Sequence, residues 1–304
     1  MASISFRAEF DPKYGEAVEV AKSVQRITCP NASPFTFHGT NTYIVGDKEV
    51  AIIDPGPEGY DGHLEAILNA VRGRTVSHII VTHTHIDHSP LCQALAAETG
   101  APVYGEGIHR AARELHLGEI NALDESGDHA FQPDFVVKHG DIIEGKEFAL
   151  EAVFTPGHTA NHMAFGLVGT EQLFSGDHVM AWATSIVAPP DGNMADYMRS
   201  LDTLLQRDET MYFPGHGGRL NKAKEFVRAL RTHRKMRETA VLQRIQKGDE
   251  TIRQIVAVIY KDTDKRLHGA AALSVFAHIE DLLRKNLIRC EGTATLDSRY
   301  HVVG

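Results

Sequence analysis

The sequence predicts an α+β chain in two parts: a sandwich of β-sheets flanked by helices, followed by a small, mostly helical domain. Short apolar, β-branched runs alternate with amphipathic segments through residues 24–221. From residue 222 the chain changes to long, basic helical segments. With 304 residues, 42% of them hydrophobic, the chain is long enough for one large core and one small one. We place the two domains at residues 1–222 and 223–304.

The first domain opens with strands and then alternates strands with helices. Residues 14–24 carry a weak pattern that predicts a short helix or an N-terminal arm. Strands are expected at residues 24–28, 42–45, 50–53, 77–81, 102–104, 135–137, 148–154, 162–168, 172–175 and 211–213. Helices are expected at residues 62–72, from 89 onward, at 109–116 and at 194–205. The acidic stretch from Gly118 to Phe131 predicts a surface loop.

The second domain is predicted to hold three helices and a hairpin. A basic helix should span residues 223–246, and Thr251 is placed to cap a second helix that reaches residue 260. The third helix, at residues 270–285, carries an apolar stripe, and two short strands follow at 287–290 and 300–303. This layout is that of a winged-helix domain.

Composition and charge narrow the function classes. The net charge of −9 divides unevenly, because residues 222–304 hold 17 Lys and Arg against 10 Asp and Glu. We find no apolar window long enough to cross a membrane, and the acidic first twenty residues lack the apolar core of a signal peptide. Cys29, Cys92 and Cys290 are widely spaced and are expected as free thiols in a reducing compartment. We therefore expect a cytoplasmic protein without a membrane partner.

Possible metal-binding side chains are most concentrated in residues 82–88, Thr-His-Thr-His-Ile-Asp-His, directly after a predicted buried strand. His83, His85, Asp87 and His88 place three imidazoles and one carboxylate at the carboxyl end of that strand. This is the usual position of a site in an α/β architecture, and the donors suit zinc or a similar divalent metal.

Three later segments supply further donors, each after an apolar run and each with a glycine before the donor. They offer His158 in Pro-Gly-His-Thr, Asp177 in Ser-Gly-Asp-His and His216 in Pro-Gly-His-Gly. A glycine lets the backbone turn sharply toward a shared centre. The seven donors together divide naturally between two metal ions.

The order His-x-His-x-Asp-His, Gly-His-Thr, Gly-Asp and Gly-His resembles the metallo-β-lactamase-fold hydrolases over about residues 24–220. Asp54, in Asp-Pro-Gly, is similar to the early strand-end aspartate of that family. The basic tail resembles the winged-helix extension of the β-lactamase-like-2 subgroup, whose best-known activity is cleavage of single-stranded RNA. The resemblance implies a four-layer αβ/βα sandwich followed by a winged-helix domain, with metals at one edge of the two sheets.

The resemblance also implies how the donors are shared. His83, His85 and His158 would hold the first metal, Asp87, His88 and His216 the second, and Asp177 would bridge them. Two divalent ions are expected, Zn²⁺ first and Mn²⁺ or Fe²⁺ as alternatives. A hydroxide between them would attack an acyl or phosphoryl centre, and Asp87 would act as the catalytic residue that orients it and takes up its proton.

Neighbouring residues carry weaker expectations. Asp54 is expected to orient a ligand histidine. His178 is expected to face the substrate or to pack, and His38 and His78 are expected to be structural. The segment 182–193 is expected either to line the substrate mouth or simply to connect two elements, and the roles of Asn41 and Tyr43 stay open.

Three functions fit the sequence. The first is an enzyme that hydrolyses a small acyl substrate (a thioester, a lactone or another ester), with the tail shaping the pocket or forming a homodimer. The second is a phosphodiesterase or endoribonuclease that acts on single-stranded RNA with help from the basic tail. The third is a non-catalytic metal-binding regulator. The complete second-metal set argues against a mono-iron persulfide dioxygenase, and the lack of a visible secretion signal argues against an exported β-lactamase.

Overall fold

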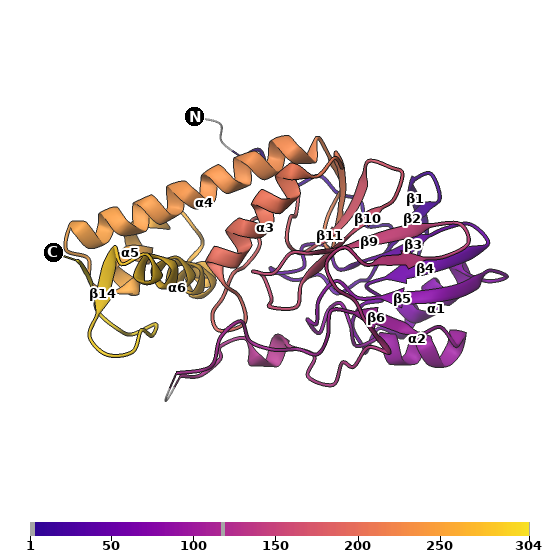
Figure 1. Ribbon diagram of the computed structural model, residues 1–304, viewed down its shortest axis with the longest axis horizontal. Helices are drawn as coiled ribbons and strands as arrows, with labels where there is room; N and C mark the ends of the chain where they lie inside the picture. Colours follow the sequence, from indigo (N-terminus) through magenta and orange to yellow (C-terminus); the bar gives the residue numbers. More distant parts are fainter. Residues whose placement is uncertain (1–3, 117–118, 304) are drawn as a thin grey trace.

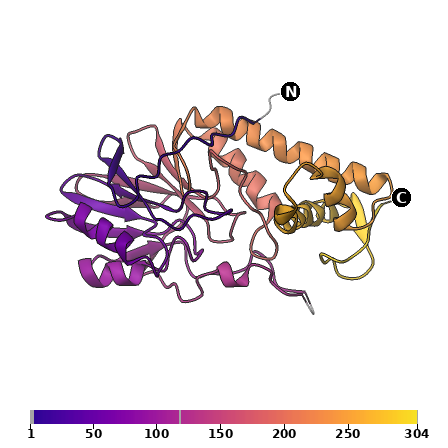
Figure 2. The same cartoon turned by 180° about the vertical axis from the view of Figure 1, so that it is seen from behind.

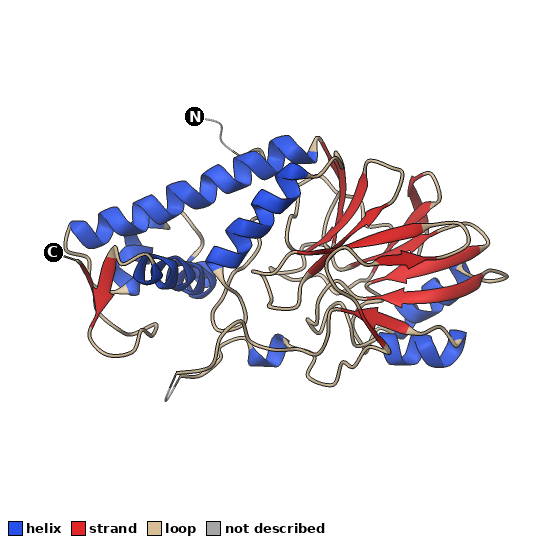
Figure 3. Cartoon of the chain, viewed as in Figure 1, coloured by secondary structure: helices blue, strands red, loops and turns tan. Residues whose placement is uncertain are grey.

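The computed structural model describes residues 4–116 and 119–303. Two β-sheets pack face to face, and helices cover the outer face of each sheet (Figures 1 and 3). The predicted four-layer sandwich is therefore confirmed. The remaining helices form a separate lobe at one end of this sandwich (Figure 2).

The first sheet has seven strands in the order of the chain. They are β1 (Val18–Ala21), β2 (Val24–Thr28), β3 (Asn41–Val45), β4 (Glu49–Ile53), β5 (Thr75–Ile80), β6 (Val103–Gly105) and β7 (Phe135–Val136). Strands β1 to β4 are antiparallel, and β4 to β7 are parallel. Parallel pairs need crossovers. Helix α1 (Asp61–Ala70) lies in the crossover from β4 to β5 and α2 (Cys92–Thr99) in that from β5 to β6, whereas the described residues between β6 and β7 hold only a 3₁₀ turn. Both helices bury apolar side chains on the outer face, among them Ile67 and Leu95.

The second sheet has six strands in the order β13-β12-β11-β10-β9-β8. They are β8 (Ile142–Glu144), β9 (Ala149–Phe154), β10 (Met163–Leu167), β11 (Gln172–Gly176), β12 (Met211–Pro214) and β13 (Leu220–Asn221). The single parallel pair, β11 with β12, is connected through α3 (Met194–Gln206). The side chain of Asn193 caps this helix by accepting from the Asp196 backbone N–H.

The main core lies between the two sheets. Phe165, Phe174 and Phe213 from the second sheet face Tyr43 and Ile80 from the first, and all five side chains are buried. The rings of Phe174 and Phe213 are stacked with centroids 5.3 Å apart, and Tyr43 lies 5.3 Å from Phe174. This dry layer holds the carboxyl ends of the strands of both sheets in fixed positions.

The C-terminal lobe contains α4 (Ala223–Gln246), α5 (Ile252–Ile259), α6 (His268–Arg284), β14 (Ile288–Cys290) and β15 (Tyr300–Val302). The expected Thr251 cap is present as a capping box with Gln254. Three helices followed by a β-hairpin confirm the predicted winged-helix layout. We propose residue 222 as the domain boundary, since β13 ends at Asn221.

Helix α4 contributes to two cores. Its first half packs Val227 and Leu230 with α3 against the second sheet. Its second half packs Val241 and Ile245 against α5 and α6. One continuous helix therefore couples the winged helix to the sandwich.

The structure differs from the predicted secondary structure in two segments. Residues 14–24, expected as a short helix or an N-terminal arm, form no helix, because β1 and β2 pair there as a hairpin at the edge of the first sheet. Residues 109–116 are irregular, since His109 turns inward to Thr84 while Arg113 reaches out to Glu119 and Glu280. Polar contacts to distant partners outweigh local helix propensity at this position.

The other differences are small. Strands β8 and β13 were not predicted from the sequence, and the predicted loop 118–131 contains a short 3₁₀ turn, η1 (Asp124–Ser126). Gly118 lies outside the described residues. A second 3₁₀ turn, η2 (Lys265–Leu267), precedes α6. In the part of the chain that the structure describes, none of the helices has the length and apolar composition that a membrane crossing requires. Cys29, Cys92 and Cys290 are all free thiols, as predicted.

The layer between the sheets should dominate stability. Phe165 is fully buried there, so Phe165→Ala leaves a cavity and should lower the free energy of unfolding by about 3–5 kcal/mol in a denaturant titration. Val168→Ala, at an exposed position beyond the end of β10, serves as the control and should change it by no more than about 0.5 kcal/mol. A loss below about 1 kcal/mol for Phe165→Ala would contradict the assigned core.

Candidate metal centre

The seven predicted donors follow four strand ends that meet at one edge of the sandwich. The segment with His83, His85, Asp87 and His88 follows β5 in the first sheet. The second sheet supplies three more donors after strands that run in the same direction, listed here as His158 after β9, Asp177 after β11 and His216 after β12. Because the sheets pack face to face, these ends lie together, as the sequence pattern predicts.

Glycines allow the close approach. Gly157 has φ of +135°, and a Cβ there would lie 2.3 Å from the Tyr197 Cα of α3. A Cβ on Gly215 would lie 2.4 Å from Asp177 Oδ1. Any other residue at these two positions would displace α3 or a donor atom, so a glycine precedes His158 and His216 for steric reasons.

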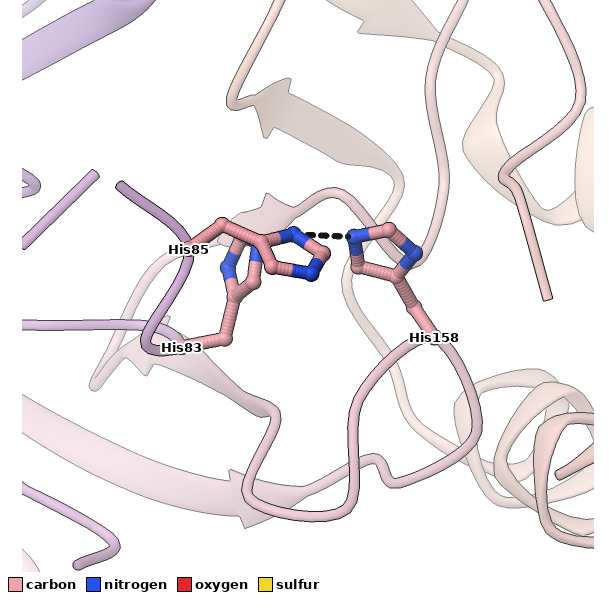
Figure 4. Close-up of side chains that lie close together, drawn as sticks. All are labelled: His83, His85 and His158. Atoms are coloured by element: carbon pink, nitrogen blue, oxygen red, sulfur yellow. Dashed lines mark hydrogen bonds between the residues drawn. The ribbon is translucent and has the colours of Figure 1, made fainter. Parts of the chain in front are cut away.

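The first group of donors is formed by His83, His85 and His158 (Figure 4). Nδ1 of His85 lies 3.1 Å from Nε2 of His83 and 3.1 Å from Nε2 of His158. The three rings meet nearly edge to face, with interplanar angles of 70° to 82°. Each imidazole thus presents one nitrogen to a common point.

The second group is formed by Asp87, His88 and His216. Asp87 Oδ2 lies 3.4 Å from His88 Nε2 and 3.1 Å from His216 Nε2. Asp177 stands between the two groups, because its Oδ2 is 3.2 Å from His216 Nε2 and 3.8 Å from His158 Nε2. Its other oxygen, Oδ1, is 3.6 Å from His88 Nε2.

These atoms fit a pair of divalent metal ions. Donors bound tetrahedrally at about 2.0–2.2 Å stand roughly 3.4 Å apart, which is the spacing found here. His88 Nε2 and Asp177 Oδ1 are buried and have no hydrogen-bond partner among the described residues. Buried polar atoms without partners are costly, and a bound cation would satisfy both.

Hydrogen bonds at the back of four of the five rings point the free lone pairs toward the centre. The Nδ1 atoms of four histidines face acceptors: His83 faces Thr82 Oγ1 at 3.0 Å, His88 faces Asp54 Oδ2 at 2.9 Å, His158 faces Ile186 O at 2.6 Å and His216 faces Gly39 O at 3.1 Å. A proton on Nδ1 leaves Nε2 as the metal-binding atom. The expected contact of Asp54 with one of these histidines is therefore present.

The two groups differ in electrostatics. Burial and the neighbouring imidazoles lower the pKa of His85 to about 3, and the pKa of His83 also lies well below its usual value. Burial alone would lower the pKa of His216, but Asp177 and Asp87 outweigh it and raise that pKa to about 9. The imidazoles of the first group are therefore neutral. The second group lies against the charges of two carboxylates, Asp87 and the shared Asp177.

A cavity of about 640 Å³ opens onto this centre. Asp87, His158, Asp177 and His216 lie on its wall, together with residues 182–186. The segment 182–193 therefore lines the mouth through its first half. Its second half connects to α3 and places Asp191 Oδ2 3.8 Å from His109 Nε2.

The same segment holds two donors in place. Ser185 Oγ donates to the backbone oxygens of Asp177 and His178, at 2.5 and 2.9 Å. The next residue, Ile186, accepts from His158 through its carbonyl. Arg234 of α4 in turn donates to the carbonyl oxygen of Ser185. The C-terminal lobe is thus connected to the centre through Ser185, which binds Arg234 by its carbonyl oxygen and the backbone of Asp177 by its hydroxyl.

Three residues that position the centre were not predicted from the sequence: His162, Ser185 and Arg234. His162 accepts from the Asp177 backbone N–H at 3.2 Å and bonds Thr155 Oγ1 at 2.8 Å, so it positions Asp177 from behind. The one available signal was its place at the start of a strand only four residues after His158. Ser185 and Arg234 carry no motif, because their partners are backbone carbonyls of remote segments.

The remaining residues singled out in the sequence are structural. His178 packs on the Tyr197 ring with centroids 4.4 Å apart. His78 bonds Ser77, and His38 packs on Phe37, as expected for structural histidines.

Asn41 and Tyr43 hold the turn that carries His216. Asn41 Nδ2 donates to the carbonyls of Pro214 and Gly217, and the Tyr43 hydroxyl also donates to Pro214. Both side chains are buried, so their contribution is to the position of this turn.

Comparisons with known proteins agree with this geometry. A model of the metallo-beta-lactamase superfamily matches residues 35–216, and one of the beta-lactamase associated winged helix domain matches residues 251–295. The beta-lactamase-like protein 2 homolog of Drosophila melanogaster is 29% identical over 296 residues, covering 93% of this chain and 94% of that protein. The atrochrysone carboxyl ACP thioesterase AacuM of Aspergillus aculeatus is 28% identical over 285 residues, covering 90% and 84%.

A solved structure shares the arrangement over nearly the whole chain. A beta-lactamase domain protein from Burkholderia ambifaria superposes with a TM-score of 0.80 at 22% identity, covering 97% of this chain and 96% of that one. At this identity the likeness concerns the fold.

The Asp54–His88 contact offers a test of the centre. Asp54→Asn keeps an acceptor for the Thr82 backbone N–H but presents an N–H to His88 Nδ1, which favours a proton on Nε2. We expect affinity for the second of two bound divalent ions to fall about 10- to 100-fold in a metal titration. Asp61→Asn, at an exposed position on α1, is the matched control. Unchanged affinity in Asp54→Asn would contradict the assigned role of His88.

Proposed function

This chain belongs to the metallo-β-lactamase superfamily, and we propose that it hydrolyses a small acyl substrate, a thioester, a lactone or another ester, with two divalent metal ions. In this proposal His83, His85 and His158 hold one ion and Asp87, His88 and His216 the other, with Asp177 shared. Zn²⁺ is the metal that the nitrogen-rich donor set favours, and Mn²⁺ or Fe²⁺ also accept these ligands. The ions, when bound, would polarise the acyl carbonyl and lower the pKa of water to about 7.

Asp87 is the proposed catalytic residue. It is the carboxylate of the centre most open to the cavity, with its side chain 22% exposed against 8% for Asp177. Its Oδ2 lies 3.1 Å from His216 Nε2, on the side of the second metal position. Asp87 is therefore placed to orient the attacking water, accept its proton and pass that proton to the leaving group.

The mainly apolar wall of the cavity is the observation that best supports an acyl substrate. Between the centre and the C-terminal helices the described wall residues are mainly apolar, including Ile86, Leu123, Met180, Trp182 and Ile186. A volume of about 640 Å³ suits a small molecule. Helices α4 and α6 complete the wall, so we propose that the tail shapes the pocket.

The charge of the tail supports this choice over single-stranded RNA. Among the described residues, seven basic side chains of the tail pair with nearby carboxylates: Lys224, Arg231, Arg244, Arg266, Arg284, Lys285 and Arg299. Local pairing reduces the positive field that would attract phosphates.

The aromatic side chains of the tail support the same choice. Phe276 and Tyr300 are buried, Phe226 packs against the core of the sandwich, and Tyr260 lies under Arg237. These rings pack within the fold or line the cavity, whereas a nucleic-acid surface presents exposed rings on which bases stack. Phosphodiester cleavage is therefore the second candidate.

Two further observations bear on the proposal. A relative that aligns over 90% of this chain carries the name of a thioesterase, which agrees with acyl chemistry. The complete donor set gives no reason to propose a purely regulatory protein, because such a role would not require Asp87 to face the cavity.

A substrate panel tests the proposal. We expect the metal-loaded protein to hydrolyse acyl thioesters or lactones faster than bis-(p-nitrophenyl) phosphate or single-stranded RNA, and chelation of the metal to abolish turnover. Release of thiol, acid or nucleotide would be measured under identical conditions. Faster cleavage of RNA than of every acyl substrate would overturn the assignment in favour of the second candidate.

Asp87→Asn tests the catalytic role. Loss of the proton acceptor should lower kcat for the best acyl substrate by about 10²- to 10⁴-fold, while the metal held by His83, His85 and His158 stays bound. Rate and metal content would be measured on the same preparation. Retention of more than about a tenth of the wild-type kcat would show that Asp87 is not the proton acceptor.

A further inference from the structure

The cavity has a second chemically distinct end, which the proposed hydrolysis does not use. On the side of the C-terminal lobe its wall is built from α4, from the segment between α5 and α6, and from the start of α6, through His233, Arg234, Arg237, Tyr260, Leu267 and Ala271. His233 and Arg234 stand on one turn of α4, and Arg237 stands on the next. The rest of the wall is mainly apolar.

Arg234 is a buried cation without a carboxylate partner among the described residues. Arg234 is only 3% exposed, and its Nη2 donates to the carbonyl oxygen of Ser185. Its Nε is buried and has no hydrogen-bond partner. The guanidinium also lies 5.1 Å from the Tyr197 ring. A buried charge held by one carbonyl and one ring is under-compensated.

Arg237, half-buried one turn further along α4, is also weakly partnered. Its guanidinium lies 4.5 Å above the Tyr260 ring, and among the described residues its side chain makes one long hydrogen bond of 3.5 Å to Ile259 O. No ion pair of Arg237 occurs in the described parts of the chain. Stacking on Tyr260 fixes the plane of the guanidinium and leaves its N–H groups free to meet a ligand.

The neighbouring groups do not neutralise this charge. Two carboxylates of the same lobe, Glu238 and Asp281, are bound to Lys285, and Asp281 also to Arg284. His233 lies beside the arginines with a buried, unpartnered Nδ1. Burial and then the positive charges of Arg234 and Arg237 lower the pKa of His233 to about 4. This end of the cavity therefore carries a net positive field.

We propose that Arg237, with Arg234 and His233, forms an anion subsite that binds an oxyanion of the substrate, joined by an apolar spacer to the scissile carbonyl. The inference rests on the proposed function, because it places that carbonyl at the metal centre. The oxyanion is either a carboxylate at the far end of the acyl group or a phosphate on the leaving group. Both would accept paired N–H bonds from a guanidinium.

Two matched pairs of thioesters distinguish the two sources. Suberoyl-N-acetylcysteamine differs from neutral octanoyl-N-acetylcysteamine by a carboxylate on the acyl group, and octanoyl-4′-phosphopantetheine differs from neutral octanoyl-pantetheine by a phosphate on the leaving group. We expect one anionic substrate to show a KM about tenfold or more below that of its neutral match, as one charge-assisted contact provides. Equal KM values within both pairs would overturn the subsite.

Variants of Arg237 localise the effect. Arg237→Gln should reduce the preference for the anionic substrate to about one, and Arg237→Lys should restore part of it. Arg228→Gln removes the same charge from an exposed position on the same helix and should keep the full preference. A preference that survives in Arg237→Gln would overturn the assignment to this residue. Circular dichroism would establish that each variant is folded.

Direct binding separates this inference from the proposed function. Calorimetry on the metal-loaded protein would compare suberate with octanoate, and 4′-phosphopantetheine with pantetheine. Suberate should bind more tightly than octanoate, or 4′-phosphopantetheine more tightly than pantetheine. If Arg237→Gln loses this difference, the subsite is supported even when no thioester is hydrolysed. Hydrolysis without any anion preference in KM or in binding would leave the proposed function standing and remove the subsite.

Discussion

The convergence of seven donor atoms at one sheet edge is the constraint on which the rest of the structure depends. Two carboxylates and five imidazoles approach to 3.1–3.8 Å in a buried volume, an arrangement that a protein sustains by binding cations. Two features make this approach possible. Glycines precede His158 and His216, and hydrogen bonds orient four of the imidazole rings from behind. Asp54, at the end of β4, illustrates the coupling, because it binds Thr82 and His88 together and so joins backbone and ligand.

The C-terminal lobe belongs to the site as much as to the fold. Helix α4 packs on the sandwich through Val227 and Leu230, and it sends Arg234 to the segment that holds Asp177 and His158. The same helix closes the cavity with apolar and basic side chains. The C-terminal lobe thus supplies part of the pocket wall and contacts that position the centre.

Much of the centre was predictable from sequence because donors that follow a strand share one sheet edge. His83, His158, Asp177 and His216 each have that signature, and the structure brings them together. Contacts to remote backbone carbonyls leave no pattern, so Ser185 and Arg234 were missed. Residues 109–116 were wrongly predicted as a helix for the same reason, since the inward contact of His109 and the ion pairs of Arg113 are non-local.

Anomalous diffraction from metal-loaded crystals, recorded at the absorption edge of the bound metal, tests the two-metal centre most directly. We expect two peaks, one among His83, His85 and His158 and one among Asp87, His88 and His216, with Asp177 in contact with both. A single peak, or a peak outside these residues, would contradict it.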